Sequence, residues 1–491
     1  MQIKNITIVG GGTAGWLTAA FISHNIPQLE ITVIDKSIGD SVGVGEGTLL
    51  SLGPFLSECG FEFSEWFFNI DATYKSAIMF KNWLAEGKDI WHPFNKANTK
   101  FDEKFRLQDL WSQNQDLDYK IYASGFYETS VKYNSVDLEN MDSYAFHVDC
   151  GKLVNFIQTK LKNKIKFIKS DVTDIIYNDD NTIKNLKLIN GEIIKSDLYV
   201  DCTGWKGLLR VPEKKVNLTD RLFCNTAVAG HIPYEDRNSE LKPYVISEAV
   251  DHGWVWNIPV HSRIGSGLVF NRDVTTIDEA KNYFCKYWNN RITPDKLKVL
   301  DWTPYYIEDM WQGNVVKIGL SAGFIEPLES TGVALITFGA AQLNNALQSQ
   351  FVSKDNTDYF NLQMKIVFED CVDFVSMHYH KNQRNTKFWN WVNSKSVISN
   401  KMQHYLDLLK DPRSVIPVGG QYNSVFVGAN WSSWLIQMGY SVAERLTGRS
   451  GEEARELIID HYNKREKFRY LGSRQHYAEI DRIHYMEKNA K

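Results

Sequence analysis

The chain has 491 residues, of which 43% are hydrophobic and 23% are charged, and its formal net charge is −4. These values are typical of a globular protein and exclude a disordered or fibrous chain. The sequence contains no long basic run that could follow a phosphate backbone, so a nucleic-acid partner is not expected.

The N-terminus leads directly into a β-branched segment, without a basic region followed by an apolar stretch, so we expect no signal peptide and no membrane span. Six cysteines form neither a CxxC pair nor a metal-ligand spacing. This pattern favours buried thiols, no metal site and a reduced, cytoplasmic setting. The chain also has 15 Trp, 23 Tyr and 26 Phe, which mostly fill cores but also suit the stacking of a flat ring.

The first 35 residues predict a βαβ unit. Ile3–Val9 is apolar and β-branched, Gly10–Gly15 forms a tight turn, Trp16–Ser23 is helical in pattern, and Ile31–Ile34 is a second strand. The strand, the glycine-rich turn and the helix occur in the order that dinucleotide-binding units require.

The turn carries the spacing Gly10-x-Gly12-x-x-Gly15, and Asp35 follows twenty residues later at the end of the second strand. Glycines at these positions let backbone N–H groups approach a pyrophosphate at the positive end of a helix. Asp35 can accept hydrogen bonds from ribose hydroxyls. The motif alone is a weak signal, but its context predicts dinucleotide binding.

The rest of the chain predicts a composite core followed by a helical part. Residues 165–201 contain short strands separated by hairpin turns at 178–181 and at 190–191. Residues 245–275 alternate like a sheet, 314–318 form a buried strand, and 333–347 form a helix. We expect an α/β core over residues 1–350, with a dinucleotide-binding turn (3–35), a β-meander (165–201) and a second sheet region (220–310), and a mainly helical region over 351–491.

Two later segments, LYVDCTGWKGLLR (198–210) and NVVKIGLSAGFIEPLESTG (314–332), resemble strand-to-loop segments of FAD enzymes. Monooxygenases of that broad class carry a Gly-Asp pair in the later segment, whereas here Gly319 is followed by Leu320-Ser321. A second GxGxxG motif for a nicotinamide cofactor is missing from the sequence. We therefore expect FAD as the cofactor and a separate NAD(P)H-dependent flavin reductase as a partner.

Motifs spread from Gly10 to Trp389 resemble those of the flavin-dependent tryptophan halogenases. They are GGGTAGW (10–16), GVGEGT (43–48), YKSAIMFKNW (74–83), FHVDCGKLV (146–154), GWVWNIP (253–259), FIEPLESTG (324–332) and FVSMHYHKNQRNTKFW (374–389). The resemblance implies a Rossmann-like FAD-binding fold of the flavin monooxygenase type, with a β-sheet substrate region and a mainly helical C-terminal part that closes the substrate pocket. It also implies that reduced flavin, dioxygen and chloride or bromide halogenate an electron-rich aromatic compound.

The resemblance assigns cofactor contacts to eleven residues. They are Gly10, Gly12, Thr13, Ala14, Gly15, Asp35, Glu46, Gly47, Val172, Leu320 and Val333. Gly47 stands where the family usually has alanine.

The same resemblance places the catalytic lysine of the family at Lys75. A lysine is usually a solvated surface charge, but the apolar flanks of Lys75 favour burial, which would lower its pKa from about 10.4. An ammonium group can hydrogen-bond hypohalous acid, and a neutral amine can form a haloamine. Either form delivers an electrophilic halogen, and the sequence leaves both open.

Glu329 matches the second catalytic residue, and the resemblance assigns the following residue, Ser330, to the catalytic set as well. A carboxylate there can stabilise the cationic intermediate and accept its proton. The alternative is a carboxylate that only complements a helix N-terminus, and Glu326 is the nearest competitor for the role. Thr331 and Gly332 begin the same helix, and the resemblance implies that they bind the halide.

Trp254, Trp256, Ile258 and Pro259 form the hallmark WxWxIP element of the family. The first three lie on one face of a strand, so plain packing is the simplest interpretation. The resemblance implies instead a wall that keeps the substrate away from the flavin and so prevents direct oxygen transfer.

The substrate pocket is expected to include four aromatic residues. They are His92, Phe94, Trp431 and Trp434. Residues 422–440 lack the tyrosine pair and glutamate that grip the amino-acid part of tryptophan in the family, so free indole, a substituted indole or a larger indole compound competes with tryptophan as the substrate. Bromide is preferred to chloride because it is easier to oxidise, and a homodimer is compatible with the family. An aromatic hydroxylase and a silent FAD- and indole-binding protein are the rival interpretations.

Overall fold

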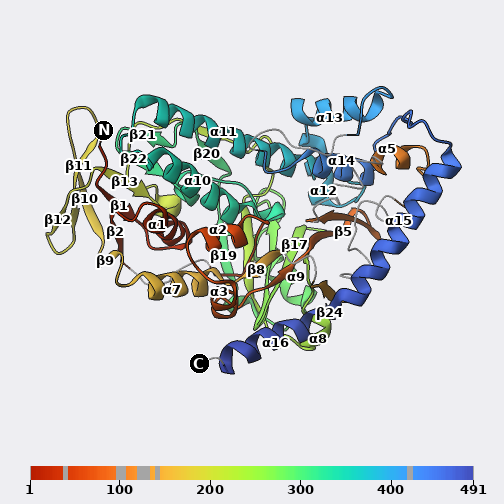
Figure 1. The fold of residues 1–491 in the computed structure, drawn as a ribbon, viewed down its shortest axis with the longest axis horizontal. Helices are drawn as coiled ribbons and strands as arrows, with labels where there is room; N and C mark the ends of the chain where they lie inside the picture. The colour runs from red at the N-terminus through yellow and green to blue at the C-terminus, as the bar shows by residue number, and fades with distance from the viewer. Residues whose placement is uncertain are drawn as a thin grey trace. The chain divides into compact units, whose positions relative to one another are not determined.

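A six-stranded sheet carries the dinucleotide-binding turn in the computed structural model, which describes residues 2–36, 43–94, 107–118, 133–138, 144–416 and 424–489. The strand order is β21-β22-β13-β1-β2-β9, and all neighbours pair in parallel except β21 and β22 (Figure 1). The bounds are β1 (Asn5–Val9), β2 (Glu30–Asp35), β9 (Lys166–Lys169), β13 (Leu198–Asp201), β21 (Trp311–Gln312) and β22 (Val315–Lys317). Central strands β1 and β13 are buried almost throughout, as parallel strands covered on both faces must be.

Helix α1 (Thr13–Asn25) connects β1 to β2 and confirms the predicted βαβ unit. It lies beside α10 (Thr331–Leu347), whose first residues follow the FIEPLE segment (Figure 1). Both helices are rich in buried apolar residues, so the packing of these side chains fixes the positions of the helices. The predicted helix over 333–347 is confirmed and begins two residues earlier.

The sheet belongs to the first of two compact units, which is assembled from Met1–Ala72, Val148–Leu222 and Trp302–Glu369. Its remaining elements are β3 (Glu46–Gly47), α2 (Leu52–Glu58), α3 (Phe63–Asn69), α7 (Cys150–Leu161), β10 (Val172–Tyr177), β11 (Ile183–Leu188), β12 (Ile193–Ile194), β14 (Lys215–Asn217), β20 (Tyr305–Ile307) and β23 (Gly323–Phe324).

The segment predicted as one β-meander divides between two sheets. Strands β10, β11 and β12 form an antiparallel meander with turns at the predicted places, and Asn181 and Gly191 adopt positive φ there. Strands β9 and β13 at its two ends join the six-stranded parallel sheet instead. Residues of β13 are buried on both faces, which explains why this strand pairs within the larger sheet.

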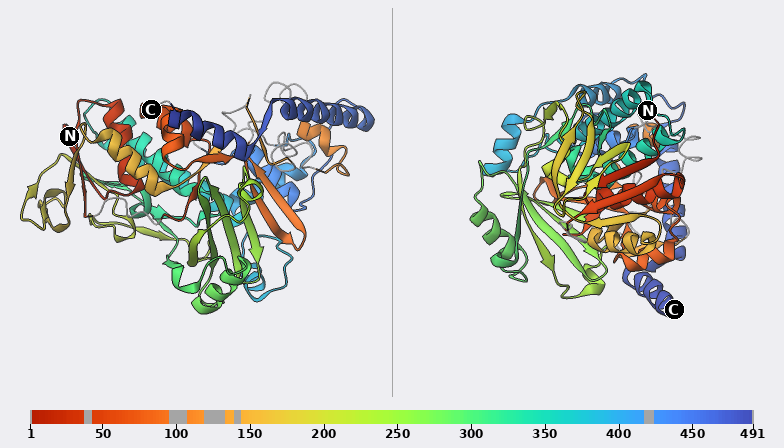
Figure 2. Two further views of the ribbon diagram at one scale, coloured as in Figure 1. Left: turned by 90° about the horizontal axis from the view of Figure 1, so that it is seen from below. Right: turned by 90° about the vertical axis from the view of Figure 1, so that its left-hand side faces the viewer.

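The second unit is assembled from Thr73–His147, Phe223–Asp301 and Asp370–Lys491. Its seven-stranded sheet has the order β19-β15-β18-β17-β16-β5-β6. The bounds are β5 (Ala77–Ala85), β6 (Lys88–Pro93), β15 (Thr226–Ile232), β16 (Val245–Val250), β17 (Gly253–Val260), β18 (Arg263–Phe270) and β19 (Lys298–Asp301). Helix α9 (Ile277–Tyr287), with a Thr276 capping box, packs on β15 and β18 (Figure 2). Phe284 of the helix and Val228 and Leu268 of the strands belong to one buried apolar cluster.

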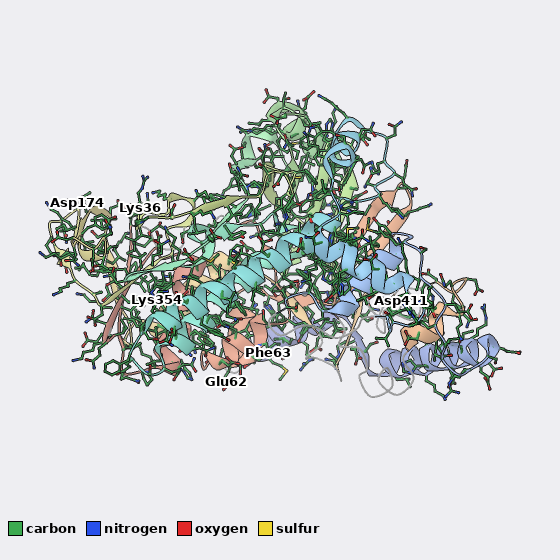
Figure 3. The ribbon with its side chains drawn as sticks, turned by 90° about the horizontal axis from the view of Figure 1, so that it is seen from above. Lys36, Glu62, Phe63, Asp174, Lys354 and Asp411 are labelled. Carbon is green, nitrogen blue, oxygen red and sulfur yellow. The ribbon has the colours of Figure 1, made fainter. Side chains whose placement is uncertain are left out.

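Two short strand pairs complete the β structure of this unit: β4 (Thr73–Lys75) pairs with β8 (Ala145–Val148), and β7 (Ser135–Asp137) pairs with β24 (Ser473–Gln475). Its helices are α5 (Leu107–Ser112), α8 (Arg237–Glu240), α12 (Lys387–Lys395), α13 (Asn400–Lys410), α14 (Gly428–Gln437), α15 (Gly451–Gly472) and α16 (His476–Asn489). Helix α11 (Lys354–Met377) begins at Lys354, which is labelled in Figure 3. From residue 354 onward, regular structure in the described chain is helical apart from β24.

All six cysteines lie in described segments, and all are buried without a disulfide. Burial raises the pKa of the Cys59 thiol and of the Cys202 thiol. These protonated thiols act as small apolar groups, as the spacing of the cysteines predicted.

Candidate active site

The turn between β1 and α1 is shaped by three glycines. A Cβ at Gly10 would lie 2.2 Å from the carbonyl oxygen of Cys202, and one at Gly15 would lie 1.9 Å from the carbonyl oxygen of Gly10. Gly12, in contrast, has nothing within 4 Å of its Cβ position. Gly10 and Gly15 therefore permit close backbone packing, while Gly12 leaves space in front of the turn.

Helix α1 begins at Thr13 with Gly12 as its N-cap, and no side chain caps it. Gly12, Thr13 and Ala14 are half-buried. Backbone N–H groups at an uncapped helix start attract an anion, and the positive end of the helix macrodipole adds to that attraction. The turn therefore fits the pyrophosphate of a dinucleotide.

Asp35 lies beneath this turn at the end of β2. Its Oδ2 accepts a hydrogen bond from the backbone N–H of Gly11, and a Cβ at Gly11 would lie 2.8 Å from the Cβ of Asp35. This contact holds the carboxylate beside the pyrophosphate turn, where the ribose of an adenosine would lie. Asp35 fits the predicted role.

Glu46 connects the second flavin motif to the start of α1. Its Oε2 accepts a hydrogen bond from the backbone N–H of Cys150 at 3.3 Å. The Cys150 thiol also interacts with Glu46 and Thr13, and burial, followed by the charge of Glu46, raises the pKa of that thiol. Gly47 follows Glu46 in β3 and is buried. The structure thus brings Glu46 to the N-terminal turn of α1.

Leu320 belongs to a 3₁₀ turn, Gly319–Ser321, that lies against the dinucleotide turn. A Cβ at Gly319 would be 2.7 Å from the Cβ of Ala14, and the Leu320 carbonyl accepts a hydrogen bond from the Tyr305 hydroxyl at 2.8 Å. Two more predicted cofactor residues, Val333 in the first turn of α10 and Val172 at the start of β10, are buried and half-buried, respectively. Val172 packs against a core cluster that includes Val9 and Ile34.

The residues predicted to bind halide begin α10. Glu329 ends a 3₁₀ turn, Pro327–Glu329, and is fully buried, and Ser330 adopts φ +60° before the helix starts at Thr331. The Oγ1 of Thr331 is buried and has no hydrogen-bond partner within the described ranges. A Cβ at Gly332 would have nothing within 4 Å. An unsatisfied hydroxyl beside an open helix N-terminus is a donor set that suits a halide.

Lys75 ends β4 and is fully buried, with a relative exposure of 0%. Its Nζ lies 4.6 Å from the ring centroid of Phe94, within the range of a cation–π contact. The backbone N–H of Phe94 donates to the Ser76 carbonyl at 2.9 Å, which fixes Phe94 next to the lysine. Lys75 is therefore not a surface charge.

The WxWxIP element lies on β17. The Trp254 and Trp256 ring centroids are 6.1 Å apart, as expected for side chains on one face of a strand. Trp254 Nε1 donates to the Tyr379 hydroxyl at 3.1 Å, and a Cβ at Gly267 would lie 2.2 Å from the Trp256 ring. Both indoles thus also pack tightly in the interior of the second unit.

Beyond the tryptophans, Ile258 is buried, and the Pro259 carbonyl accepts a hydrogen bond from the Thr73 hydroxyl at 2.6 Å. Thr73 lies on β4, two residues before Lys75. The end of the hallmark element is therefore tied directly to the strand that carries the lysine.

The predicted pocket residues belong to an aromatic cluster. The His92 ring lies 5.7 Å from Phe94 and 5.4 Å from Phe374, and its Nε2 lies 2.7 Å from Nδ2 of Asn430. Phe374 in turn lies 5.2 Å from Trp431. The structure thus brings Lys75, Phe94, His92 and Trp431 into one continuous set of contacts.

Trp431 and Trp434 are fully buried within that cluster. Trp431 stacks on Tyr405, with centroids 4.9 Å apart, and Trp434 stacks on His378 at 3.7 Å. Phe80 makes an edge contact with Trp434 at 4.6 Å. Tyr405 and His378 thus already stack on the two indoles. Of the four predicted pocket residues, Phe94 contacts Lys75 and His92 contacts Phe94, so these two lie nearest to the lysine.

The sequence assigns no role to several residues that contact the site. They are Thr73, His147, Tyr379 and Asn430. His147 and Tyr379 lie within motifs that carry the family resemblance, but only the strand pairing and the distant hydrogen bonds show what they contact. No cluster of three or more potential metal ligands exists among the residues that the structure describes.

The parallel sheet, the glycine turn and the uncapped helix starts define a dinucleotide-binding α/β protein of the Rossmann-like type. The sequence profile of the tryptophan halogenase family matches residues 5–450, so the chain belongs to that family. It is therefore a flavin-dependent halogenase, an oxidoreductase that uses FAD and halide.

Individual relatives and solved structures agree with this assignment. The chain is 29% identical to the tryptophan 6-halogenase ThaL of Streptomyces albogriseolus, over 84% of this chain and 81% of that protein. It is 28% identical to the tryptophan 7-halogenase RebH of Lentzea aerocolonigenes, over 83% and 82%.

A tryptophan halogenase structure from Shewanella frigidimarina superposes with a TM-score of 0.88 at 25% identity and covers 99% of this chain and 98% of that one. A flavin-dependent halogenase from Xanthomonas campestris shares the fold, with a TM-score of 0.89 at 24% identity, and covers 98% and 99%. In the part of the chain that the structure describes, no helix is both long and apolar enough to cross a membrane.

Proposed function

We propose that this enzyme halogenates an indole by delivering hypohalous acid through Lys75. The observation that carries the proposal is the complete burial of this lysine with its Nζ over the Phe94 ring. A buried ammonium group costs free energy unless it has a function or compensating contacts. Its aromatic surroundings suit both a flat substrate and an electrophilic halogen.

The first unit would hold the cofactor and the halide. Gly10, Gly12 and Gly15 would contact the pyrophosphate, Asp35 would bind the ribose, and Thr331 would donate to the halide. Bound reduced FAD would supply, together with dioxygen, the two-electron oxidation of the halide. The single glycine motif supports dependence on a separate NAD(P)H-dependent flavin reductase.

In the halogenation step, the aromatic carbon would give an electron pair to the halogen while the bond from halogen to oxygen in hypohalous acid, or to nitrogen in a haloamine, breaks. Lys75 would orient the hypohalous acid by hydrogen bonding, or carry the halogen as a haloamine. Glu329 would then accept the proton that leaves the ring, and hydroxide would combine with a proton to form water. The WxWxIP wall would keep the ring from the flavin, so that halogen rather than oxygen is transferred.

The substrate that we favour is free indole or an indole without the amino-acid group of tryptophan. The relatives are named as halogenases of tryptophan. The sequence of residues 422–440 lacks the tyrosine pair and glutamate that would hold that group, whereas His92 and Phe94 would supply flat contacts for the ring. Bromide is favoured over chloride because it is oxidised more easily. A homodimer and a cytoplasmic location complete the proposal.

The test is mass spectrometry of indole and tryptophan incubated with the protein, FAD, an external reductase with NADH, air, and bromide or chloride. We expect a regiospecific halogen isotope pattern with the wild type. Lys75→Met should lower product formation at least a hundredfold, because it removes the delivering group, and should leave FAD affinity unchanged. The matched control is Lys88→Met, which changes an exposed lysine on β6.

Halogenated product at the wild-type rate from Lys75→Met would reject the lysine mechanism. Hydroxylated product would favour a monooxygenase. Ligand binding without turnover across the panel would favour a silent flavin- and indole-binding protein. Catalase and enzyme-free reactions control for halogenation by peroxide in solution.

A further inference from the structure

His147 is a fully buried histidine on β8 whose ring orientation is fixed by two hydrogen bonds in series. Its Nδ1 lies 2.8 Å from the Thr73 hydroxyl, and that hydroxyl donates to the Pro259 carbonyl at 2.6 Å. A carbonyl oxygen can only accept, so the single proton of Thr73 points to Pro259. The Thr73 oxygen must then accept from Nδ1–H, which leaves the lone pair of His147 on Nε2.

This Nε2 is a buried acceptor that the folded chain does not satisfy. Within the ranges that the structure describes, it has no hydrogen-bond partner. Leaving a buried polar atom unsatisfied costs free energy, so such atoms call for an explanation by function or by a missing ligand.

Lys75 lies on the same face of the β4–β8 pair as this acceptor. Thr73 pairs with His147 and Lys75 pairs with Ala145, so Lys75 and His147 are diagonal neighbours. Side chains at diagonal positions of an antiparallel pair are within reach of one another when one of them is long. The long side chain of Lys75 is therefore within reach of the His147 ring.

The surroundings keep the imidazole uncharged. Burial, followed by the positive charge of Lys75 and then by His476, lowers the pKa of His147 well below its usual value, and the Pro259 carbonyl opposes this shift only in part. The groups that face it are Lys75 on β4, His476 on α16 and the Pro259 carbonyl on β17. A neutral imidazole cannot take and hold the lysine proton, but it can accept a hydrogen bond from it.

We propose that His147 is a positioning residue whose Nε2 accepts a hydrogen bond from the Lys75 ammonium group during halogen delivery. Thr73 and the Pro259 carbonyl fix the tautomer, so the end of the WxWxIP element controls the orientation of the lysine. The inference rests on the proposed function of Lys75 and deepens it. It favours an ammonium group that orients hypohalous acid, because the acceptor stabilises the charged form and no covalent step is required.

Two substitutions separate this role from a structural one. His147→Asn retains a donor near the Thr73 oxygen but loses the acceptor at Nε2, whereas His147→Gln can return an amide oxygen close to Nε2. The full-length variants are compared with FAD, the external reductase, bromide and indole. The measurements are kcat, the KM for indole, the melting temperature, and the ratio of scavenger-trapped hypobromous acid to bromoindole.

We expect His147→Asn to lower kcat by about tenfold to a hundredfold, which is the effect of losing one hydrogen bond to a charged group. The KM for indole should change little, trapped hypobromous acid should rise relative to product, and His147→Gln should recover much of the loss. Thr73→Val should cause the same shift in product ratio, because it releases the tautomer. This variant also serves if His147→Asn fails to fold. His404→Asn, on the exposed side of α13, is the matched control.

A wild-type kcat and product ratio in both His147→Asn and Thr73→Val would overturn the inference. A higher activity in His147→Asn than in His147→Gln would also overturn it. That order would mean that only the contact with Thr73, which His147→Asn retains, matters for activity. If the wild type halogenates and these variants do so equally well, only the inference fails. If the wild type forms no halogenated product, the proposed function fails and the inference fails with it.

Discussion

Replacement of Gly12 by alanine should separate cofactor binding from folding. Gly12 has φ −81° and nothing within 4 Å of its Cβ position, so alanine fits the folded chain. The loss of a good N-cap residue costs at most about 1 kcal/mol. The added methyl group would nevertheless occupy the space where a pyrophosphate must approach. We expect FAD affinity to fall at least a hundredfold, which corresponds to about 2.7 kcal/mol.

A thermal-shift titration with FAD measures both the stability of the unliganded protein and its affinity for FAD. At an FAD concentration one hundred times the wild-type Kd, binding stabilises the wild type by about 2.7 kcal/mol and a hundredfold weaker variant by only about 0.4 kcal/mol. For units of roughly 200 residues, these energies correspond to shifts of about 5–10 °C and 1–2 °C. Gly15→Ala is the contrasting variant, because its Cβ would clash with the Gly10 carbonyl and destabilise the unliganded protein. A wild-type FAD shift in Gly12→Ala would refute the assignment of the turn to the pyrophosphate.

Three further predictions concern the halide, pH and the core. Thr331→Val should raise the KM for halide about tenfold without changing FAD affinity, because it removes one buried donor. The test is a halide titration of turnover in this variant and in Thr331→Ser, which keeps the hydroxyl. Burial lowers the pKa of His476 in the folded protein to about 3, so below about pH 6.5 the unfolded chain binds more protons than the folded one. The free energy of unfolding should therefore drop by about 2–3 kcal/mol from pH 7 to 4.5. Urea titrations should show a smaller drop in His476→Gln, and an equal drop would exclude His476 as the cause. Trp434→Ala should cost about 3–5 kcal/mol of stability, measured in the same way, whereas a loss below about 1 kcal/mol would contradict its tight packing against His378.

Local patterns in the sequence predicted the parts of the fold that are built from neighbouring residues. The βαβ unit, the hairpin turns near Asn181 and Gly191, and the helix that follows Glu329 depend on periodicity and turn chemistry over a few residues, and the structure contains each of them. Strands β9 and β13 were harder to assign, because their partners lie far away in the sequence. Short apolar runs do not show whether a strand joins a meander or a parallel sheet.

The candidate site shows the same division. The family motifs indicated Lys75 and Glu329, but the aromatic cluster that Lys75 contacts through Phe94 includes residues of β6, α11 and α14, which no local pattern connects. His147 was visible only as part of a motif, and its unsatisfied Nε2 became evident from its bonds to Thr73 and, through Thr73, to Pro259. Trp431 and Trp434 were expected to offer stacking surfaces, and the structure shows that Tyr405 and His378 stack on them.

Each compact unit is assembled from three segments that are separated by long stretches of chain. The first unit cannot complete its parallel sheet until the ribosome has released β22, and the second requires α16 near the end of the chain. Contacts over such sequence distances slow folding and leave apolar surface exposed during synthesis. Production in cells should therefore benefit from slow translation, low temperature and chaperones, and truncation at a simple boundary should not yield either unit alone.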